Sequence, residues 1–181
     1  MTILSVISAP ALDSERNTGP EVVDTETLKG IQWNKVALNF TNPFINRNGD
    51  VVNYSVIVVE TDRNSLQLKQ DITESWYTAY KQNPSPPYAA IYKCQDMFGK
   101  SPGCADTAVT ENSRNRSTGS VDYAMVVIGG DASCEPDIVI AGTYCNGPLK
   151  QNTRYMVFLR GYNEENEFVD AAGVAFFTGN S

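Results

Sequence analysis

The chain has 181 residues, of which 41% are hydrophobic and 10% aromatic, and this composition excludes disordered, collagen-like and low-complexity classes. It contains no histidine, which excludes catalytic triads, Cys-His pairs and histidine-bound zinc. A formal net charge of −7 argues against nucleic-acid partners, and the lack of a long apolar run predicts no membrane insertion by this chain.

Two segments in the first third predict β-strands. Residues 35–40 (KVALNF) alternate polar and apolar side chains, and residues 51–59 (VVNYSVIVV) are rich in β-branched side chains. Between them, residues 46–50 (NRNGD) contain the Asn-Gly pair that is typical of a tight hairpin turn. We therefore expect these two strands to pair with each other in antiparallel fashion.

A short amphipathic helix is predicted over residues 71–83 (DITESWYTAYKQN). Its apolar side chains recur at helical spacing, and Asp71 and Glu74 are spaced like a capping box. Three prolines follow directly and end the pattern. We expect Trp76 and Tyr80 to anchor this helix in the core.

The rest of the chain predicts more strands. Residues 88–92 and 121–128 each match a strand pattern, and the polar residues 111–120 before the second are typical of a mobile loop. Residues 153–162 and 168–178 predict a closing hairpin across an acidic turn. The sequence therefore indicates a mostly β protein.

The cysteines favour disulfides over a metal site. Neighbouring cysteines are at least nine residues apart, whereas zinc sites need close pairs. An even number in turn-rich sequence indicates two disulfides and an oxidising compartment. Short loops favour joining the first to the second and the third to the fourth, but three pairings remain open for Cys94, Cys104, Cys134 and Cys145.

Three sequons permit N-glycosylation without showing it. They occur no more often than chance predicts for this composition. The strand alternation places Asn39 and Asn53 on outward faces, and the third candidate, Asn115, lies in the polar loop.

The stretch 147–155 (GPLKQNTRY) resembles the E–F corner of a fibronectin type III domain. Leu149 and Tyr155 match the tyrosine corner of that family, in which the Tyr hydroxyl bonds to backbone upstream. Trp33 stands slightly before the place of the tryptophan in the family's second strand. The resemblance implies a fibronectin type III-like antiparallel β-sandwich.

The interval from Tyr54 to Tyr155 is as long as a whole sandwich of about 100 residues, so a long insertion with a short helix and extra strands is expected. With residues 48–58 and 144–150 (YCNGPLK), this insertion resembles the membrane-proximal extracellular region of receptor-type protein tyrosine phosphatases that carry fibronectin repeats and one cytoplasmic phosphatase domain. The expected parts are a lead-in (1–19), the elaborated domain (20–178, insertion 60–146) and a tail (179–181).

That resemblance implies a non-catalytic extracellular module of a single-pass, glycosylated receptor in adhesion or signalling, with phosphatase activity in another domain. A phosphatase loop needs Cys followed six residues later by Arg, and here those positions hold Lys100, Thr110, Ile140 and Gln151. No cofactor or metal is expected. The module would be a membrane-proximal spacer, and its partner would be an extracellular protein ligand or a second copy of the receptor.

Candidate ligand contacts are the charged side chains of two turns, Glu164, Glu165, Glu167, Arg114 and Arg116. Two alternatives carry less weight. A glycosidase would need paired carboxylates, and Asp131, Glu135 and Asp137 show no spacing that demands it. An adhesion or carbohydrate-binding sandwich unrelated to phosphatases would stack sugars on exposed aromatics such as Tyr77, Tyr88, Tyr92 and Phe98.

Overall fold

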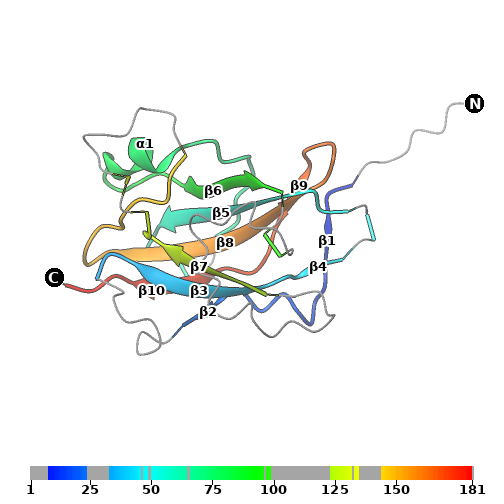
Figure 1. Cartoon of the computed structure of the whole chain (residues 1–181), viewed down its shortest axis with the longest axis horizontal. Helices are drawn as coiled ribbons and strands as arrows, with labels where there is room; N and C mark the ends of the chain where they lie inside the picture. Colours follow the sequence, from blue (N-terminus) through cyan, green and yellow to red (C-terminus); the bar gives the residue numbers. More distant parts are fainter. Residues whose placement is uncertain are drawn as a thin grey trace, which may run out of the picture.

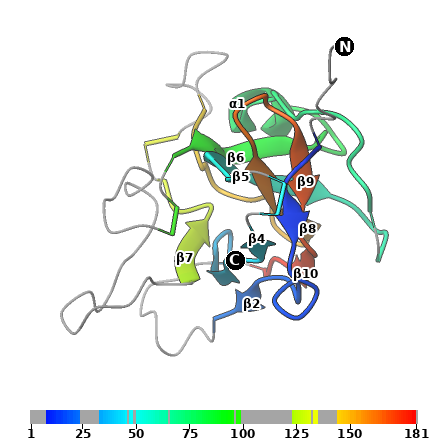
Figure 2. The same ribbon diagram turned by 90° about the vertical axis from the view of Figure 1, so that its right-hand side faces the viewer.

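Antiparallel sheets dominate the computed structural model, which describes residues 8–23, 33–45, 47–48, 50–64, 66–95, 97–98, 123–131, 133–134 and 144–180. Figure 1 and Figure 2 show the sheets packed as a sandwich, with one short helix at its side. The elements are β1 (Ala11–Leu12), β2 (Glu21–Val22), β3 (Val36–Thr41), β4 (Phe44–Ile45), β5 (Asn53–Glu60), α1 (Trp76–Tyr80), β6 (Tyr88–Cys94), β7 (Tyr123–Ile128), β8 (Arg154–Tyr162), β9 (Phe168–Asp170) and β10 (Val174–Phe177).

Two larger sheets enclose the main core. One has the strand order β10-β8-β5-β6, with β9 also paired to β8, and the other has the order β2-β3-β7. Alternating side chains of β5 and β8 face those of β3 and β7, and bury one continuous apolar cluster. Its fully buried members include Leu38, Phe40, Val56, Val58, Val126, Ile128, Tyr155, Val157 and Leu159.

The sheet β10-β8-β5-β6 is also covered on its outer face. A second apolar cluster there contains Ile57 and Val59 of β5 with Met156 and Phe158 of β8. Residues 66–72, which run between β5 and α1, contribute the apolar side chains that cover them. Both faces of β5 and β8 are therefore buried, which explains why these strands are apolar almost throughout instead of alternating.

The predicted hairpin between the first two strands is wrong. β3 pairs with β2 and β7, whereas β5 pairs with β6 and β8 in the opposite sheet. Residues 42–52 connect the two sheets, and within them β4 pairs with β1. An Asn-Gly pair specifies a local turn, but burial of β3 and β5 on facing sheets decides which strands pair.

The helix is shorter than predicted and the capping box is absent. α1 begins after Ser75, whose side chain makes no cap hydrogen bond to the helix backbone. The preceding residues are extended, because the Ala89 amide donates to the Glu74 carbonyl at 3.0 Å and Ser75 forms a parallel bridge with Ala89. The Asp71 carboxylate instead accepts from the Tyr162 hydroxyl at 2.8 Å.

The other strand predictions are confirmed. β6 and β7 lie where the pattern places strands, and β8 pairs with both β9 and β10. β7 belongs to the sandwich core although it falls within the expected insertion, and β1 ties part of the expected lead-in to β4. The predicted loop 111–120 lies outside the described residues. In the part of the chain that the structure describes, no helix is long and apolar enough to cross a bilayer.

Candidate functional site

Residues 147–155 form the corner at which the chain enters β8, and the hydroxyl of Tyr155 holds this corner in place. This side chain is only 2% exposed, and its oxygen accepts a hydrogen bond from the Lys150 amide at 3.0 Å. Burial raises the pKa of Tyr155 to about 12, so the hydroxyl stays protonated at physiological pH. Leu149 is equally buried in the main core and fixes the other side of the corner.

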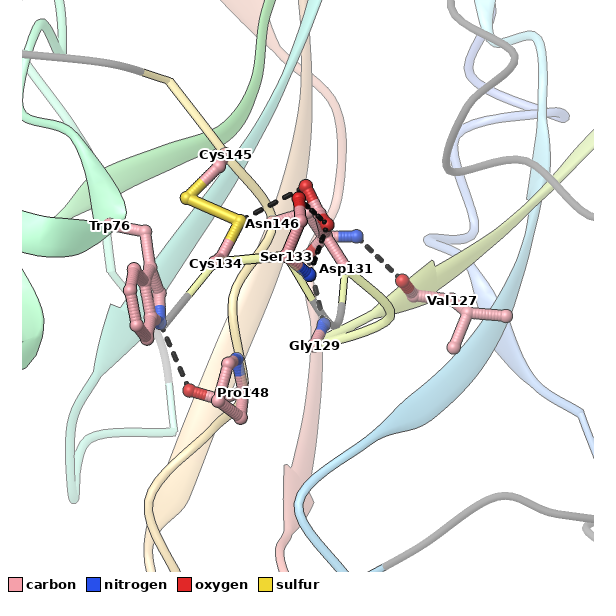
Figure 3. Close-up of a disulfide and its surroundings, with 9 residues drawn as sticks. All are labelled: Trp76, Val127, Gly129, Asp131, Ser133, Cys134, Cys145, Asn146 and Pro148. Atoms are coloured by element: carbon pink, nitrogen blue, oxygen red, sulfur yellow. Dashed lines mark hydrogen bonds between the residues drawn. A yellow bond between two sulfur atoms is a disulfide. The ribbon is translucent and has the colours of Figure 1, made fainter. Parts of the chain in front are cut away.

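Trp76 connects the helix to the same corner. Its indole nitrogen donates to the Pro148 carbonyl at 2.9 Å (Figure 3). Its ring lies directly against Gly147, where a side chain would overlap the indole. The Tyr80 ring packs on Trp76 with centroids 4.9 Å apart, as expected for core anchors. α1 is therefore attached to the sandwich through the residues that precede β8.

A disulfide closes the segment between β7 and the corner. Cys134 and Cys145 are bonded with Cα atoms 6.1 Å apart. Next to it the buried Asn146 side chain donates to the Val127 carbonyl at 2.6 Å and accepts from the Gly129 amide at 2.8 Å (Figure 3). The disulfide and the Asn146 side chain together fasten the end of β7 to the corner.

The remaining cysteines of the chain are Cys94 and Cys104. Cys94, at the end of β6, is also disulfide-bonded. Cys104 lies outside the described residues.

An ion pair links the corner to the residues around α1. The Lys150 ammonium lies 2.9 Å from the Glu60 carboxylate, which also accepts from the Ser85 amide at 2.9 Å. Burial alone raises the pKa of Glu60, but the hydrogen bonds from Ser85 and Lys150 outweigh it and hold that pKa below its usual value. The Glu60 carboxylate therefore stabilises the fold through contacts within the protein.

A buried guanidinium holds β9 and the segment before α1 together. Arg160 has no exposed surface and binds both oxygens of Asp170, at 2.6 and 2.9 Å. It also donates to the Gln70 carbonyl at 2.9 Å and lies 3.8 Å from the centroid of Phe168. Its hydrogen-bonding capacity is used by the protein itself, which is typical of a structural network.

The acidic turn after β8 is ordered by one side chain. Asn163 is 3% exposed, and its carbonyl oxygen accepts from the amides of Glu165 and Glu167 at 3.1 and 2.9 Å. Glu164 and Glu165 are exposed, whereas Glu167 is half-buried. The structure therefore presents two of the three predicted carboxylates to solvent. The other predicted contacts, Arg114 and Arg116, lie outside the described residues.

Two of the predicted glycan acceptors lie within the described residues. Asn39 is half-buried on the face of β3 opposite to Leu38 and Phe40. The Asn53 amide, in the orientation that suits its neighbours, donates to two backbone carbonyls at 3.2 Å. Asn115 lies outside the described residues.

The aromatic side chains considered for sugar stacking mostly serve the fold. Tyr88 is buried, Tyr92 stacks on Tyr144 with centroids 4.2 Å apart, and the half-buried Phe98 packs edge-on against Tyr54. Tyr77 is half-buried on α1. No exposed row of rings is formed by these four side chains.

The carboxylates considered for glycosidase chemistry form no pair that the structure describes. Asp131 accepts from the amide and hydroxyl of Ser133 in a local turn, while Glu135 and Asp137 lie outside the described residues. No cluster of metal-ligating side chains occurs among the described residues.

Sequence reasoning missed Asn146 and Tyr144, because short polar or aromatic residues between turns carry no pattern that reveals their partners. Arg160 did carry a signal. It stands among apolar residues in a predicted strand, and a charged side chain there needs a buried partner.

Comparison with known families adds one finding. A family model described as TM proximal of protein tyrosine phosphatase, receptor type J, matches residues 40–172, which include the corner, the disulfide and the Arg160 network. No curated protein matches the chain.

Proposed function

The chain belongs to the family of membrane-proximal regions of receptor-type protein tyrosine phosphatases, and we propose that it is the non-catalytic extracellular spacer of its receptor. A region of this family is part of a plasma-membrane protein, and the disulfide between Cys134 and Cys145 fits an extracellular location. Family membership confirms the resemblance expected from the sequence and replaces the alternative of an unrelated carbohydrate-binding sandwich. The phosphatase activity would reside in a cytoplasmic domain of the parent receptor.

The observation that carries the spacer proposal is the way the inserted segments are fastened to the sandwich. The indole of Trp76, the disulfide and the Lys150–Glu60 pair all fix the corner before β8. β1 and the end of β10 lie at opposite ends of the long axis in Figure 1. A nine-residue strand such as β8 spans about 30 Å. A rigid module of this kind therefore keeps its two ends at a fixed distance from each other.

The test replaces the module in the complete receptor by a flexible Gly/Ser chain of equal length. Energy transfer from a fluorophore placed before the module to a dye in the membrane measures the height of the ectodomain. With the native module we expect a narrow distribution of heights, and with the flexible chain a much broader one, because flexible chains behave as random coils. Identical distributions would contradict the spacer role.

A second proposed role is recognition of an extracellular protein ligand at the acidic turn, favoured by the ordered display of Glu164 and Glu165. Soluble receptor ectodomain carrying Glu164→Gln and Glu165→Gln should then bind ligand-bearing cells less well than wild type. Glu15→Gln, an exposed carboxylate of another turn, is the matched control. Equal binding of all three proteins would remove the turn from the candidates.

The remaining proposal for a partner is a second copy of the receptor. Sedimentation velocity of this chain over a concentration series distinguishes a module that self-associates from one that acts as a spacer alone. A monomer throughout is expected of a spacer with a net charge of −7. A dimer would instead make the module a controller of receptor pairing.

A further inference from the structure

We propose that one end of the sandwich rests on the phospholipid headgroups of the bilayer. This aromatic end consists of residues 33–35, 61–64, 150–154 and 177–180. The proposal rests on the proposed function, because it applies only to a module held beside a membrane. It adds the orientation of the module and the side chains that touch lipid.

Backbone hydrogen bonds bring the four segments together. The Leu149 amide donates to the Asn34 carbonyl at 2.9 Å, next to the start of β3. The amide of Thr61 donates to the Arg154 carbonyl at 3.1 Å, and that of Thr178 donates to the Thr153 carbonyl at 3.0 Å. In Figure 1 this end lies on the left, where β5 and β10 end and where β3 and β8 begin.

Two aromatic side chains project from this end. Phe177 is 72% exposed, more than any other large hydrophobic side chain among the described residues, and Trp33 is 37% exposed. The neighbouring Phe176 packs against the main core, so the strand alternation directs Phe177 away from it. Gly179 lies close to Trp33, where an added Cβ would meet the Trp33 Cβ at 3.8 Å. Single exposed aromatics are common, but this end of the sandwich carries two of them.

Cations surround the aromatic side chains. The Arg154 guanidinium lies 5.9 Å from the Phe177 ring and is fixed by the carbonyls of Thr61 and Arg63. The same four segments contain the exposed Arg63 and the half-buried Lys35, with Asp62 as their exposed anion among the described residues. Aromatic rings with Lys and Arg characterise the membrane–water interface, where the rings sit at headgroup level and the cations meet phosphate.

The opposite end has the opposite character. The turns there carry the acidic side chains Asp13, Glu15, Asp50, Glu164 and Glu165, which outnumber the cations Arg16, Arg47 and Lys93 of the same end. A net charge of −7 repels lipid phosphates on average, so an approach is favourable only through the end where cations gather. This charge complementarity selects the orientation with the aromatic end toward the bilayer and the acidic turn away from it.

The chain supplies its own probe for this contact. Trp33 and Trp76 are its two tryptophans, and Trp76 is buried, so quenching by bromine-labelled lipid acts on Trp33. The chain has no histidine, so a hexahistidine tag at either end tethers it to nickel-chelating lipid in one defined orientation. The measurement is Trp fluorescence on vesicles of brominated phosphatidylcholine, with the tag at the C-terminus or at the N-terminus.

We expect quenching with the C-terminal tether and little with the N-terminal tether. Trp33→Phe should abolish the difference. Phe177→Ser should reduce the quenching by a factor of about two or more, because it removes the larger apolar contact. Tyr123→Ser is the matched control, since Tyr123 is 57% exposed but pairs with Thr41 at the far end of β3, and it should leave quenching unchanged.

Equal quenching with both tethers, or no effect of Phe177→Ser, would overturn the proposal. So would Trp33 emission that changes with protein density on the vesicle but not with lipid bromination, because a second copy would then cover this end. The height measurement on the complete receptor is independent of lipid contact. A module with a fixed height and an unquenched Trp33 would be a spacer that does not touch the bilayer.

Discussion

At the scale of single residues, the hydroxyl of Tyr155 is the contact most open to a clean test. Tyr155→Phe removes the acceptor of the part-buried Lys150 amide while leaving the ring in place. We expect the free energy of unfolding to fall by about 1–2 kcal/mol, measured by urea denaturation. Tyr123→Phe, which alters an exposed side chain, should change nothing. An unchanged midpoint in Tyr155→Phe would remove the tyrosine-corner assignment.

Gly147 is required because the Trp76 indole occupies the space where its side chain would be. Gly147→Ala should therefore force the ring away from the corner and lower the free energy of unfolding by about 1–3 kcal/mol. The emission of Trp76 should shift to longer wavelength as the ring meets water. Gly179→Ala is the matched control, because its new methyl group would meet only an ordinary contact with Trp33. Equal stability of the two variants would show that the indole adapts.

The residues that could be predicted were those with a local pattern. Leu149 and Tyr155 were singled out because their spacing is characteristic of one kind of corner, and Trp76 because it lies at helical spacing with other apolar residues. Asn146 could not be found, since its partners, Val127 and Gly129, are brought near only by the fold. Contacts across such sequence distances depend on the pairing of strands.

At the scale of elements, the disulfide between Cys134 and Cys145 should stabilise the connection from β7 to β8. Replacing both cysteines by serine is expected to lower the free energy of unfolding by about 2–4 kcal/mol, since it frees a closed loop in the unfolded chain. Amide exchange at Gly129 should also accelerate, because its acceptor Asn146 loses its anchor. Thiol titration of denatured, unreduced protein should detect no thiol at Cys94, Cys134 or Cys145. Titration of these cysteines would contradict the oxidised state and the extracellular location.

The strands themselves were more predictable than their partners. An alternating or continuously apolar pattern located β3, β5, β6, β7 and β8, because burial of one or both faces is recorded in the sequence of each strand separately. The predicted pairing of β3 with β5 was wrong, because strand pairing depends on which sheet each strand joins. The predicted helix was too long because Asp71, assigned to its cap, is instead held by Tyr162 across the sheet.

At the scale of the whole molecule, buried tyrosines should make the protein sensitive to alkali. Burial raises the pKa of Tyr88, Tyr155 and Tyr162 above the value of about 10 in an unfolded chain, for Tyr155 to about 12. The unfolded state then loses protons first, so the contribution of these tyrosines to stability is constant below pH 10 and falls between about pH 10 and pH 12. Urea denaturation over this range measures the decline.

Tyr155→Phe should make that decline shallower, because one of the shifted groups is gone. Tyr123→Phe serves as its control, since the Tyr123 side chain is 57% exposed. A stability that stays constant through pH 12 would mean that these hydroxyls are solvated in the native state.

The opposite placement of β1 and β10 also determines how the module would respond to tension along its long axis. A pull along the long axis first loads β1, which pairs with β4 over two residues and is preceded by side-chain hydrogen bonds from Asn48 and Asn163. On the other side it loads β10, which is paired over four residues with the long central strand β8. We expect β1 to detach from β4 at low force while the disulfide-bonded sandwich stays folded. The module would then lengthen by a short, reversible step before it unfolds.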